Sequence, residues 1–326
     1  DTTGINDLNV TCLVITESNE PIIGTRNGGI QYWDKDLYRT WRTPFQPIMG
    51  VTALAKGNNG RIYAVGTNID LYVTTNNGRN WTQLASYKDN GNISAFAIDN
   101  GVIFGQFNSK NLRYSSDYGN NWSLTNLPDS KVNAIIKTNS GTYYLGCQKG
   151  LFTSIDGTNW AQHSRFKDTV VEALAYKDGF LVASVTYYPP PPNPPATPGD
   201  PVPSIHISID DGASFTKKTY PTNGPLTNKL LIALNGNIYA RMNQMIYKST
   251  DNANSWSTLN ISGFGNLTVN DINVDAINAN FVYVATNKGL FKSQDGGSNW
   301  LYTKLSYLTQ DTLNCRVVNV SNDGRI

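Results

Sequence analysis

Two carboxylates, Glu172 and Asp271, are by type and position the best candidates for acid–base chemistry. Polar residues recur at one position of several short β-type runs, and these two are the only acids among them; the others are Thr11, Thr52, Ser94 and Asn133, with one run ambiguous between Lys229 and Leu230. A carboxylate pair can supply the acid and the base of glycoside hydrolysis. The other interpretation is that this polar column lines a water-filled channel.

Nucleophilic and metal chemistry have less support in the sequence. No Gly-x-Ser-x-Gly elbow occurs, and His163 and His206 have no cysteine nearby at a metal-binding spacing. Cys12, Cys147 and Cys315 are too few for a disulfide framework. Cys12 and Cys315 stand at matching places in two similar runs, so they either pair or remain buried thiols. We expect no metal and no cofactor.

Basic residues occur in the loop between the second and third strand-like runs of five sequence repeats, where Asp70 and Asp200 are the acidic residues. They are Arg26, Lys110, Lys149, Arg241 and Lys288. Such a set would attract anionic groups, although exposed charges are screened within about 10 Å. The sequence therefore allows an anionic ligand here, or ordinary solvated turns.

Aromatic residues occur in nearly every loop that joins one repeat to the next. They are Phe45, Tyr87, Phe166, Tyr220, Phe264 and Tyr307. Aromatic faces stack on sugar rings or anchor partner proteins. The alternative is that these rings pack between neighbouring repeats.

A proline-rich insertion begins at Tyr187-Tyr188 and continues to about residue 204. Proline at this density favours extended polyproline II and cannot join a strand ladder. We expect a stiff arm that walls a groove or presents a ligand to a partner, with Tyr187 and Tyr188 at its base. A tolerated surface insertion is the other interpretation.

These residues are positioned by a polar turn that recurs seven times and closes on an aromatic residue. The clearest copies are Ser115-x-Asp117-x-Gly-x-x-Trp122, Ser208-x-Asp210-x-Gly-x-x-Phe215 and Ser293-x-Asp295-x-Gly-x-x-Trp300. Looser copies contain Asn76 and Trp81, Asp156 and Trp160, and Asp251 and Trp256, and a decayed copy keeps Asp36 and Trp41. Asp and Ser side chains accept bonds from backbone N–H groups in such turns, so we predict a structural role.

The spacing of the turns predicts an all-β, seven-bladed β-propeller. The closing aromatics recur about every 40 residues, the length of one four-stranded blade. Short β-branched and aromatic runs separated by Asn/Gly turns predict the strands, with the repeated turn joining the third and fourth strand of each blade. The predicted blades are 8–45, 46–86, 90–127, 130–166, 169–221, 226–261 and 267–305. Residues 311–326 are either a closing segment or the start of an eighth repeat, because Asn322–Ile326 repeats Asn58–Ile62.

The Ser-x-Asp-x-Gly-x-x-Trp pattern resembles the Asp-box, or bacterial neuraminidase repeat, of secreted propellers such as sialidases and xyloglucanases. The resemblance covers nearly the whole chain and implies the fold rather than a reaction. The chain lacks the Arg-Ile-Pro signature of sialidases, and only three Glu residues are present to supply their Tyr/Glu pair. Xyloglucanases of this type place their catalytic groups between two propellers, of which one is present here.

Composition narrows the classes of partner. The net charge is +2 without a Lys/Arg block, which argues against nucleic acid, and no apolar run is long enough to cross a bilayer. A polar, weakly charged surface resembles that of secreted proteins, so we expect an extracellular, cell-surface or periplasmic location in bacteria, in a chain that is part of a longer protein.

The sequence therefore predicts a non-enzymatic recognition module that binds a glycan or a protein through the loops around the channel mouth. A glycoside hydrolase using Glu172 and Asp271 is the first alternative. A structural or assembly unit of a larger surface protein is the second.

Overall fold

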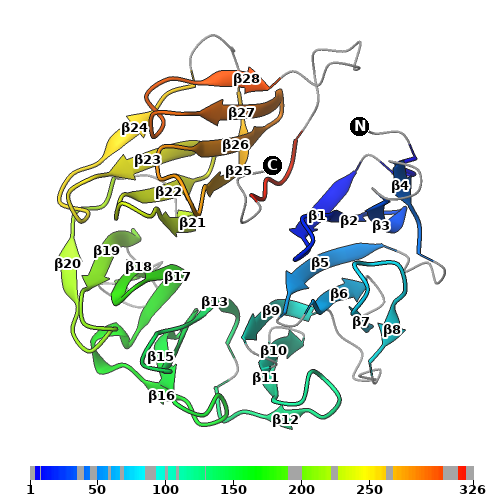
Figure 1. Ribbon diagram of the computed structural model, residues 1–326. Coiled ribbons are helices and arrows are strands. Elements are labelled where there is room, and N and C mark those ends of the chain that lie inside the picture. The colour runs from blue at the N-terminus through cyan, green and yellow to red at the C-terminus, as the bar shows by residue number, and fades with distance from the viewer. Residues whose placement is uncertain are drawn as a thin grey trace. The chain divides into compact units, whose positions relative to one another are not determined.

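Seven four-stranded antiparallel sheets follow one another along the described part of the chain (Figure 1). The computed structural model describes residues 4–7, 9–34, 40–44, 50–57, 60–66, 70–84, 93–99, 102–107, 110–128, 130–189, 200–221, 227–261, 267–303 and 315–320. For residues 93–99, 107, 110–111 and 228 it describes the backbone only. The sheets are numbered below as blades 1 to 7.

The strands of blades 1 to 4 are short, and each blade runs in chain order from its first to its fourth strand. Blade 1 holds β1 (Val10–Ile15), β2 (Pro21–Thr25), β3 (Gly29–Asp34) and β4 (Thr40–Arg42). Blade 2 holds β5 (Val51–Lys56), β6 (Ile62–Gly66), β7 (Leu71–Thr74) and β8 (Thr82–Gln83). Blade 3 holds β9 (Ile93–Asp99), β10 (Val102–Phe107), β11 (Lys110–Ser115) and β12 (Ser123–Leu124). Blade 4 holds β13 (Val132–Lys137), β14 (Tyr143–Cys147), β15 (Gly150–Ser154) and β16 (Ala161–Gln162).

Blades 5 to 7 repeat this order, with longer central strands in blade 5. Blade 5 holds β17 (Thr169–Lys177), β18 (Phe180–Tyr187), β19 (Val202–Ser208) and β20 (Thr216–Lys218). Blade 6 holds β21 (Thr227–Ile232), β22 (Ile238–Met242), β23 (Met245–Ser249) and β24 (Ser257–Leu259). Blade 7 holds β25 (Val269–Val274), β26 (Val282–Thr286), β27 (Gly289–Ser293) and β28 (Leu301–Thr303).

The fold is therefore the predicted all-β, seven-bladed β-propeller of four-stranded antiparallel blades, with the repeated turn between the third and fourth strands. In the described residues the helical structure is a single 3-10 turn, η1 (Ser164–Phe166). No helix in that part of the chain has the length and hydropathy needed to span a membrane.

The chain forms two compact units. Unit 1 comprises Asp1–Asn108, Arg113–Ser123 and Ile261–Ile326, and therefore holds blades 1, 2 and 7. Unit 2 comprises Ser109–Leu112 and Leu124–Asn260, and therefore holds blades 4, 5 and 6. In blade 3, β9 and β10 lie in unit 1, and β11 and β12 are each divided between the two units.

Burial explains why the second strand of each blade reads as a continuous apolar run. All residues of β6, β14 and β26 are buried. In β6, Ala64 belongs to the apolar cluster with blade 1 and Val65 to the cluster with blade 3, so a neighbouring sheet covers each of its two faces. The fourth strands are short and largely exposed, as in β8 and β16. The core is therefore a series of apolar layers between blades, such as the one that Leu174 of blade 5 forms with Tyr144 of blade 4.

The first strand of each blade contains a β-bulge, and these bulges correct the prediction of which polar residues share one strand position. The ladder skips one residue per blade, and the skipped residues are Thr11, Thr52, Ser94, Asn133, Glu172, Asn228 and Asn270. Asp271 is therefore not equivalent to Glu172, because it occupies the ladder position opposite Ala285. The position left ambiguous in blade 6 belongs to Asn228, not to Lys229 or Leu230.

The three cysteines are free thiols, so Cys12 and Cys315 do not pair. Burial raises the pKa of both thiols to about 11, which keeps them neutral near pH 7. Among the described residues no group of His, Cys, Asp and Glu side chains is arranged to hold a metal ion.

Candidate binding site

The polar groups of the repeated turns are used within the turns themselves. In blade 7 the Ser293 hydroxyl donates to Asp295 Oδ1 (2.8 Å) and accepts the backbone N–H of Gly297 (2.7 Å). Asp295 Oδ1 also accepts the N–H of Asn299, and Asn299 Nδ2 donates to Oδ2. These bonds lower the pKa of Asp295 to about 2. An engaged carboxylate of this kind is a structural group.

The same bonds recur in the other described turns. Ser115, Ser154, Ser208 and Ser249 each donate to the Asp two residues on. The indole N–H of Trp81, Trp122 and Trp160 donates to the Gly carbonyl of its own turn. Ala253 replaces that Gly in blade 6 with a φ of 59°. Asp36, in the decayed first copy, lies outside the described residues.

Arg26, Lys149 and Lys288 lie at turns between second and third strands, whereas Arg241 lies within β22 and Lys110 begins β11. The predicted basic residues are also divided between the two units. Arg26 and Lys288 belong to unit 1, whereas Lys149 and Arg241 belong to unit 2. Arg26 and Lys149 are exposed, and Arg241 is half-buried with Nη1 donating to the carbonyl of Asn243 (3.4 Å). Lys110 begins β11, where the backbone alone is described.

Phe166 agrees with the second interpretation of the aromatic loop residues, packing between repeats, because only 1% of its surface is exposed. Its ring meets those of Phe215 (4.9 Å between centroids) and His206 (5.0 Å) edge to face. Tyr220 packs against the core between blades 5 and 6, and its hydroxyl lies 3.0 Å from Thr227 Oγ1. Both rings stabilise contacts between blades. Phe45, Tyr87, Phe264 and Tyr307 lie outside the described residues.

Tyr187 and Tyr188, in contrast, are exposed. Their exposed fractions are 42% and 41%, and Val202, which pairs with Tyr187, is 46% exposed. β18 and β19 have eight and seven residues, against five in β22 and β23, so the hairpin continues in ladder pairing to the base of the proline-rich insertion. Met245, at the corresponding turn of blade 6, is 44% exposed.

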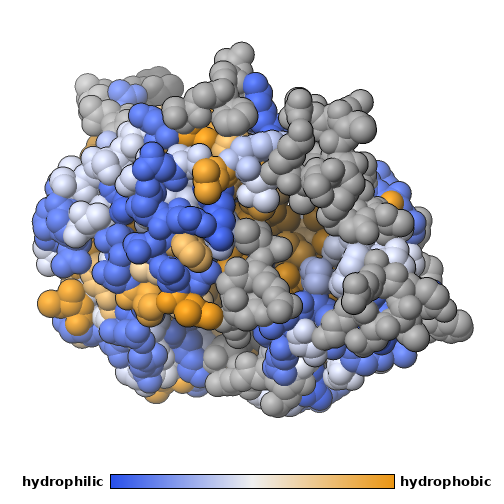
Figure 2. Space-filling model, turned by 45° about the horizontal axis from the view of Figure 1, so that its top comes forward, coloured by the Kyte–Doolittle hydropathy of each residue, from blue (hydrophilic) through white to orange (hydrophobic). Residues whose placement is uncertain are grey.

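We call Tyr187, Tyr188, Val202 and Met245 the hairpin patch. Its residues lie at second-to-third-strand turns of two blades that pack on each other, since β17 and β18 both contact β21. Most of the described surface in Figure 2 is hydrophilic, with apolar residues in small separate groups. Three of its residues gather at the blade 5 hairpin, where Tyr187 pairs with Val202, and Met245 stands at the corresponding turn of blade 6.

Glu172 and Asp271 have different environments. Burial raises the pKa of Glu172, an effect that the Thr186 hydroxyl and Lys131 partly offset, and Oε1 is a buried atom without a hydrogen-bond partner in the described residues. The Asp271 carboxylate accepts the backbone N–H groups of Ile272 (2.9 Å) and Val318 (3.2 Å). One carboxylate oxygen of Glu172 is therefore available for other contacts, whereas both carboxylate oxygens of Asp271 accept backbone N–H groups.

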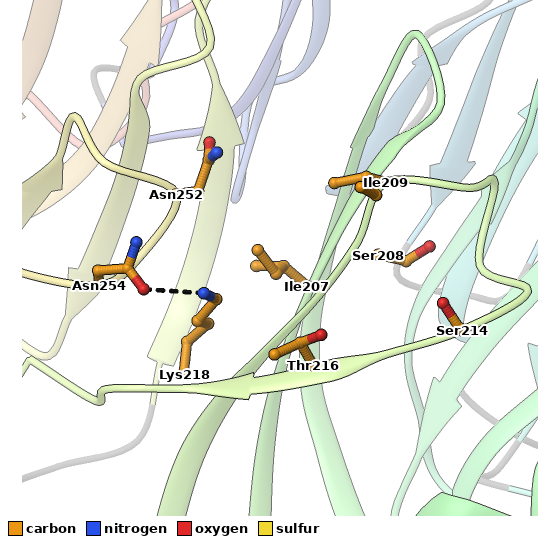
Figure 3. A pocket seen from close by; sticks show the side chains of 8 residues that line it. All are labelled: Ile207, Ser208, Ile209, Ser214, Thr216, Lys218, Asn252 and Asn254. Atoms are coloured by element: carbon orange, nitrogen blue, oxygen red, sulfur yellow. Dashed lines mark hydrogen bonds between the residues drawn. The ribbon is translucent and has the colours of Figure 1, made fainter.

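A separate polar cleft of about 250 Å³ lies between the outer strands of blade 5 and the repeated turn of blade 6 (Figure 3). Lys218 Nζ donates to Asn254 Oδ1 (2.8 Å) on one side of it. Its lining is Ile207, Ser208, Ile209, Ser214, Thr216, Lys218, Asn252 and Asn254. Ser208 and Ser214 bond to Asp210 in the turn, which leaves a shallow, mainly structural crevice.

Val202 and Met245 of the hairpin patch were not among the binding residues predicted from sequence. Both are apolar residues at the start of a third strand, where core residues are also expected. Their position directly beside a turn could have indicated exposure, because the next blade does not cover a side chain there.

Comparison with known proteins supports the fold. Residues 32–175, less than half of the chain, match the profile of a family described as "DUF6242 beta propeller domain". The computationally designed protein Ika8 is similar in structure over 97% of this chain and 91% of its own, with 13% identity and a TM-score of 0.68. No curated protein matches the sequence.

Two natural proteins of similar structure have different activities. A GH74 xyloglucanase from Xanthomonas campestris is 13% identical, with a TM-score of 0.62 over 90% of this chain and 54% of its own. YCF48, solved with a D1 peptide, is 16% identical, with a TM-score of 0.56 over 76% of this chain and 80% of its own. This chain thus shares the propeller fold of a glycoside hydrolase and of a peptide-binding protein, and at these identities the likeness shows the fold alone.

Proposed function

We propose that this chain is a recognition module of the Asp-box type, secreted or at the cell surface, that binds a glycan or a protein through the hairpin patch. The observation that carries this proposal is the exposure of Tyr187, Tyr188, Val202 and Met245 at neighbouring turns. Tyrosine and methionine are enriched where proteins contact partners, and tyrosine also stacks on sugars. Arg241, at the end of β22, supplies a cation for an anionic group on the partner.

The weakly charged composition supports the extracellular or periplasmic location in this proposal. The xyloglucanase and the YCF48–peptide complex supply one precedent for each class of ligand, glycan and peptide.

A glycoside hydrolase remains the second candidate, because burial raises the pKa of Glu172 in the direction that a general acid requires. The Asp271 carboxylate, first considered as the partner of Glu172, accepts two backbone N–H groups, so this candidate depends mainly on Glu172. Loss of polysaccharide hydrolysis in Glu172→Gln, with retention in Asp271→Asn, would support this candidate against the binding module.

The binding proposal is tested by screening the full chain on a glycan array and against a displayed peptide library, then measuring affinity for the best ligand by calorimetry. Replacing Tyr187 and Tyr188 with Ala should weaken binding by about 1–3 kcal/mol, because stacking and burial of two rings are lost. A matched control is Ile155→Ala with Ile209→Ala, since these side chains are 85% and 77% exposed on repeated turns. Equal affinity in both double variants would refute the patch, and the absence of any ligand would favour a structural unit.

A further inference from the structure

Residues 315–320 align in sequence with the first strand of a blade. Cys315-Arg-Val-Val-Asn-Val-Ser-Asn-Asp-Gly-Arg-Ile326 matches Val51-Thr-Ala-Leu-Ala-Lys-Gly-Asn-Asn-Gly-Arg-Ile62 without a gap, and both end in Asn-x-Gly-Arg-Ile. In this alignment Cys315 corresponds to Val51 and therefore to Val10, not to Cys12. Val318 corresponds to Leu54, a residue packed against the core between blades 1 and 2.

The hydrogen bonds of Cys315 reproduce those between consecutive blades. In blade 4 the bulged residue Asn133 donates from Nδ2 to the carbonyl of Val171 (2.9 Å) in the first strand of blade 5. In blade 1 the bulged residue Thr11 donates from Oγ1 to the carbonyl of Val51. The bulged residue of blade 7, Asn270, donates from Nδ2 to the carbonyl of Cys315 (2.7 Å). Cys315 therefore stands where the next blade begins.

Side-chain packing gives the same register. Val171 packs on Gly146 of blade 4, and Val51 packs on Gly24 of blade 1. In β26 of blade 7, Ala285 occupies the strand position that Gly146 and Gly24 occupy in their blades. Cys315 packs against the cluster that contains Ala285, Tyr283 and Val318. Val318 is buried beside Tyr283 in the way that Leu174 is buried beside Tyr144.

The segment also reaches blade 1, which belongs to the same unit. Asn319 Nδ2 donates to the carbonyl of Leu13 in β1 (3.4 Å). Figure 1 draws the segment, in red, alongside β25 and β26. No strand in the described part of the chain pairs with residues 315–320. In every blade, in contrast, a second strand pairs with the first, as Ala64 of β6 does with Leu54 of β5.

We propose that the free edge of Cys315–Val320 accepts a β-strand of the same repeat type, as the inner strand of an eighth blade. The occupant is a mainly apolar strand like β6, because the sequence match with Val51–Ile62 continues up to the residue at which β6 begins. Addition of an extended strand to such an edge gains main-chain hydrogen bonds and buries alternate side chains.

The test extends the full chain after Ile326 with a copy of residues 63–84, which contain the remainder of β6, β7 and β8. Amide hydrogen exchange of residues 315–320 is then compared with that of the unextended chain and of a chain with a scrambled extension. Exchange should slow at least tenfold with the copied extension only. Unchanged exchange, or equal slowing with the scrambled extension, would overturn the proposal.

A second measurement separates strand docking from general stabilisation. Asn270→Ala in the extended chain removes the bond to Cys315 and should speed exchange of residues 315–320 by at least threefold. Asn133→Ala removes the equivalent bond between blades 4 and 5 and should leave exchange at 315–320 unchanged. Equal effects of the two variants at 315–320 would contradict the proposed register.

Discussion

In this protein the role of a side chain depends more on the groups around it than on its residue type. The hydroxyl of Ser293 is buried and joins Asp295 to the N–H of Gly297. The hydroxyl of Ser204, also buried, lies 3.2 Å from His206 Nε2. These two serines share a chemistry, but the first closes a turn and the second lies beside a titratable ring.

Removal of the Ser293 hydroxyl should destabilise blade 7. Ser293→Ala leaves the Gly297 N–H without its acceptor in a buried turn, which costs about 1–3 kcal/mol. The expected result is a lower urea midpoint of unfolding at an unchanged slope. Gln294→Ala, at the exposed neighbouring position, is the control, and equal midpoints in the two variants would show that the bond contributes nothing.

His206 should make stability depend on pH in the mildly acidic range. Burial, with smaller contributions from Arg165 and Lys217, lowers its pKa to about 4, against about 6.5 in the unfolded chain. The unfolded state then binds the proton more readily, so stability is complete above about pH 6.5 and falls as the pH drops towards 4. The loss is about 3 kcal/mol over that window.

The check is the free energy of unfolding measured by urea at pH 7, 6, 5 and 4.5. His206→Leu should flatten the dependence. In His163→Leu, which removes another histidine whose pKa is lowered by burial, the part due to His206 should remain. A dependence as steep in His206→Leu as in the parent chain would contradict the assignment.

At the scale of strands and sheets, close packing between blades depends on small residues in the second strands. A Cβ placed on Gly146 would lie 2.6 Å from Val171 Cγ1 of the next blade. This spacing leaves no room for a methyl group, because protein interiors are already packed to crystal-like density.

Gly146→Ala should therefore destabilise the protein by about 1–3 kcal/mol through overpacking. Val171→Ala opens space at the same contact, so the double variant should lose less stability than the sum of the two single variants. A double-mutant cycle in urea measures this coupling. Strict additivity would mean that the two residues do not meet.

On the scale of the whole molecule, composition makes a prediction about partners. A net charge of +2 without a basic block gives little counterion release on a polyanion. Fluorescence anisotropy with a 30-base-pair duplex should show no binding below about 100 μM at 150 mM salt. Submicromolar binding under these conditions would contradict the expectation that nucleic acid is not a partner.

The fold was predictable from sequence because its signals are local. A turn such as Ser115-x-Asp117-x-Gly119 encodes its own hydrogen bonds, and its repetition every 40 or so residues predicts the number of blades. The candidate site was less predictable. The sequence placed Tyr187 and Tyr188 at the base of the proline-rich insertion, and both are exposed. For Phe166 it left open whether the ring binds a ligand or packs between repeats, and the ring is buried.

By itself, then, the sequence determined the repeat, the strand order and the place of the turn in each blade, since these follow from hydrogen bonds within about 40 residues. Only the tertiary structure decided that Asp271 stands in the ladder while Asn270 bulges, and that His206 meets Phe166. These outcomes depend on which side chains the next blade brings into contact, and that contact is formed between segments distant in the chain.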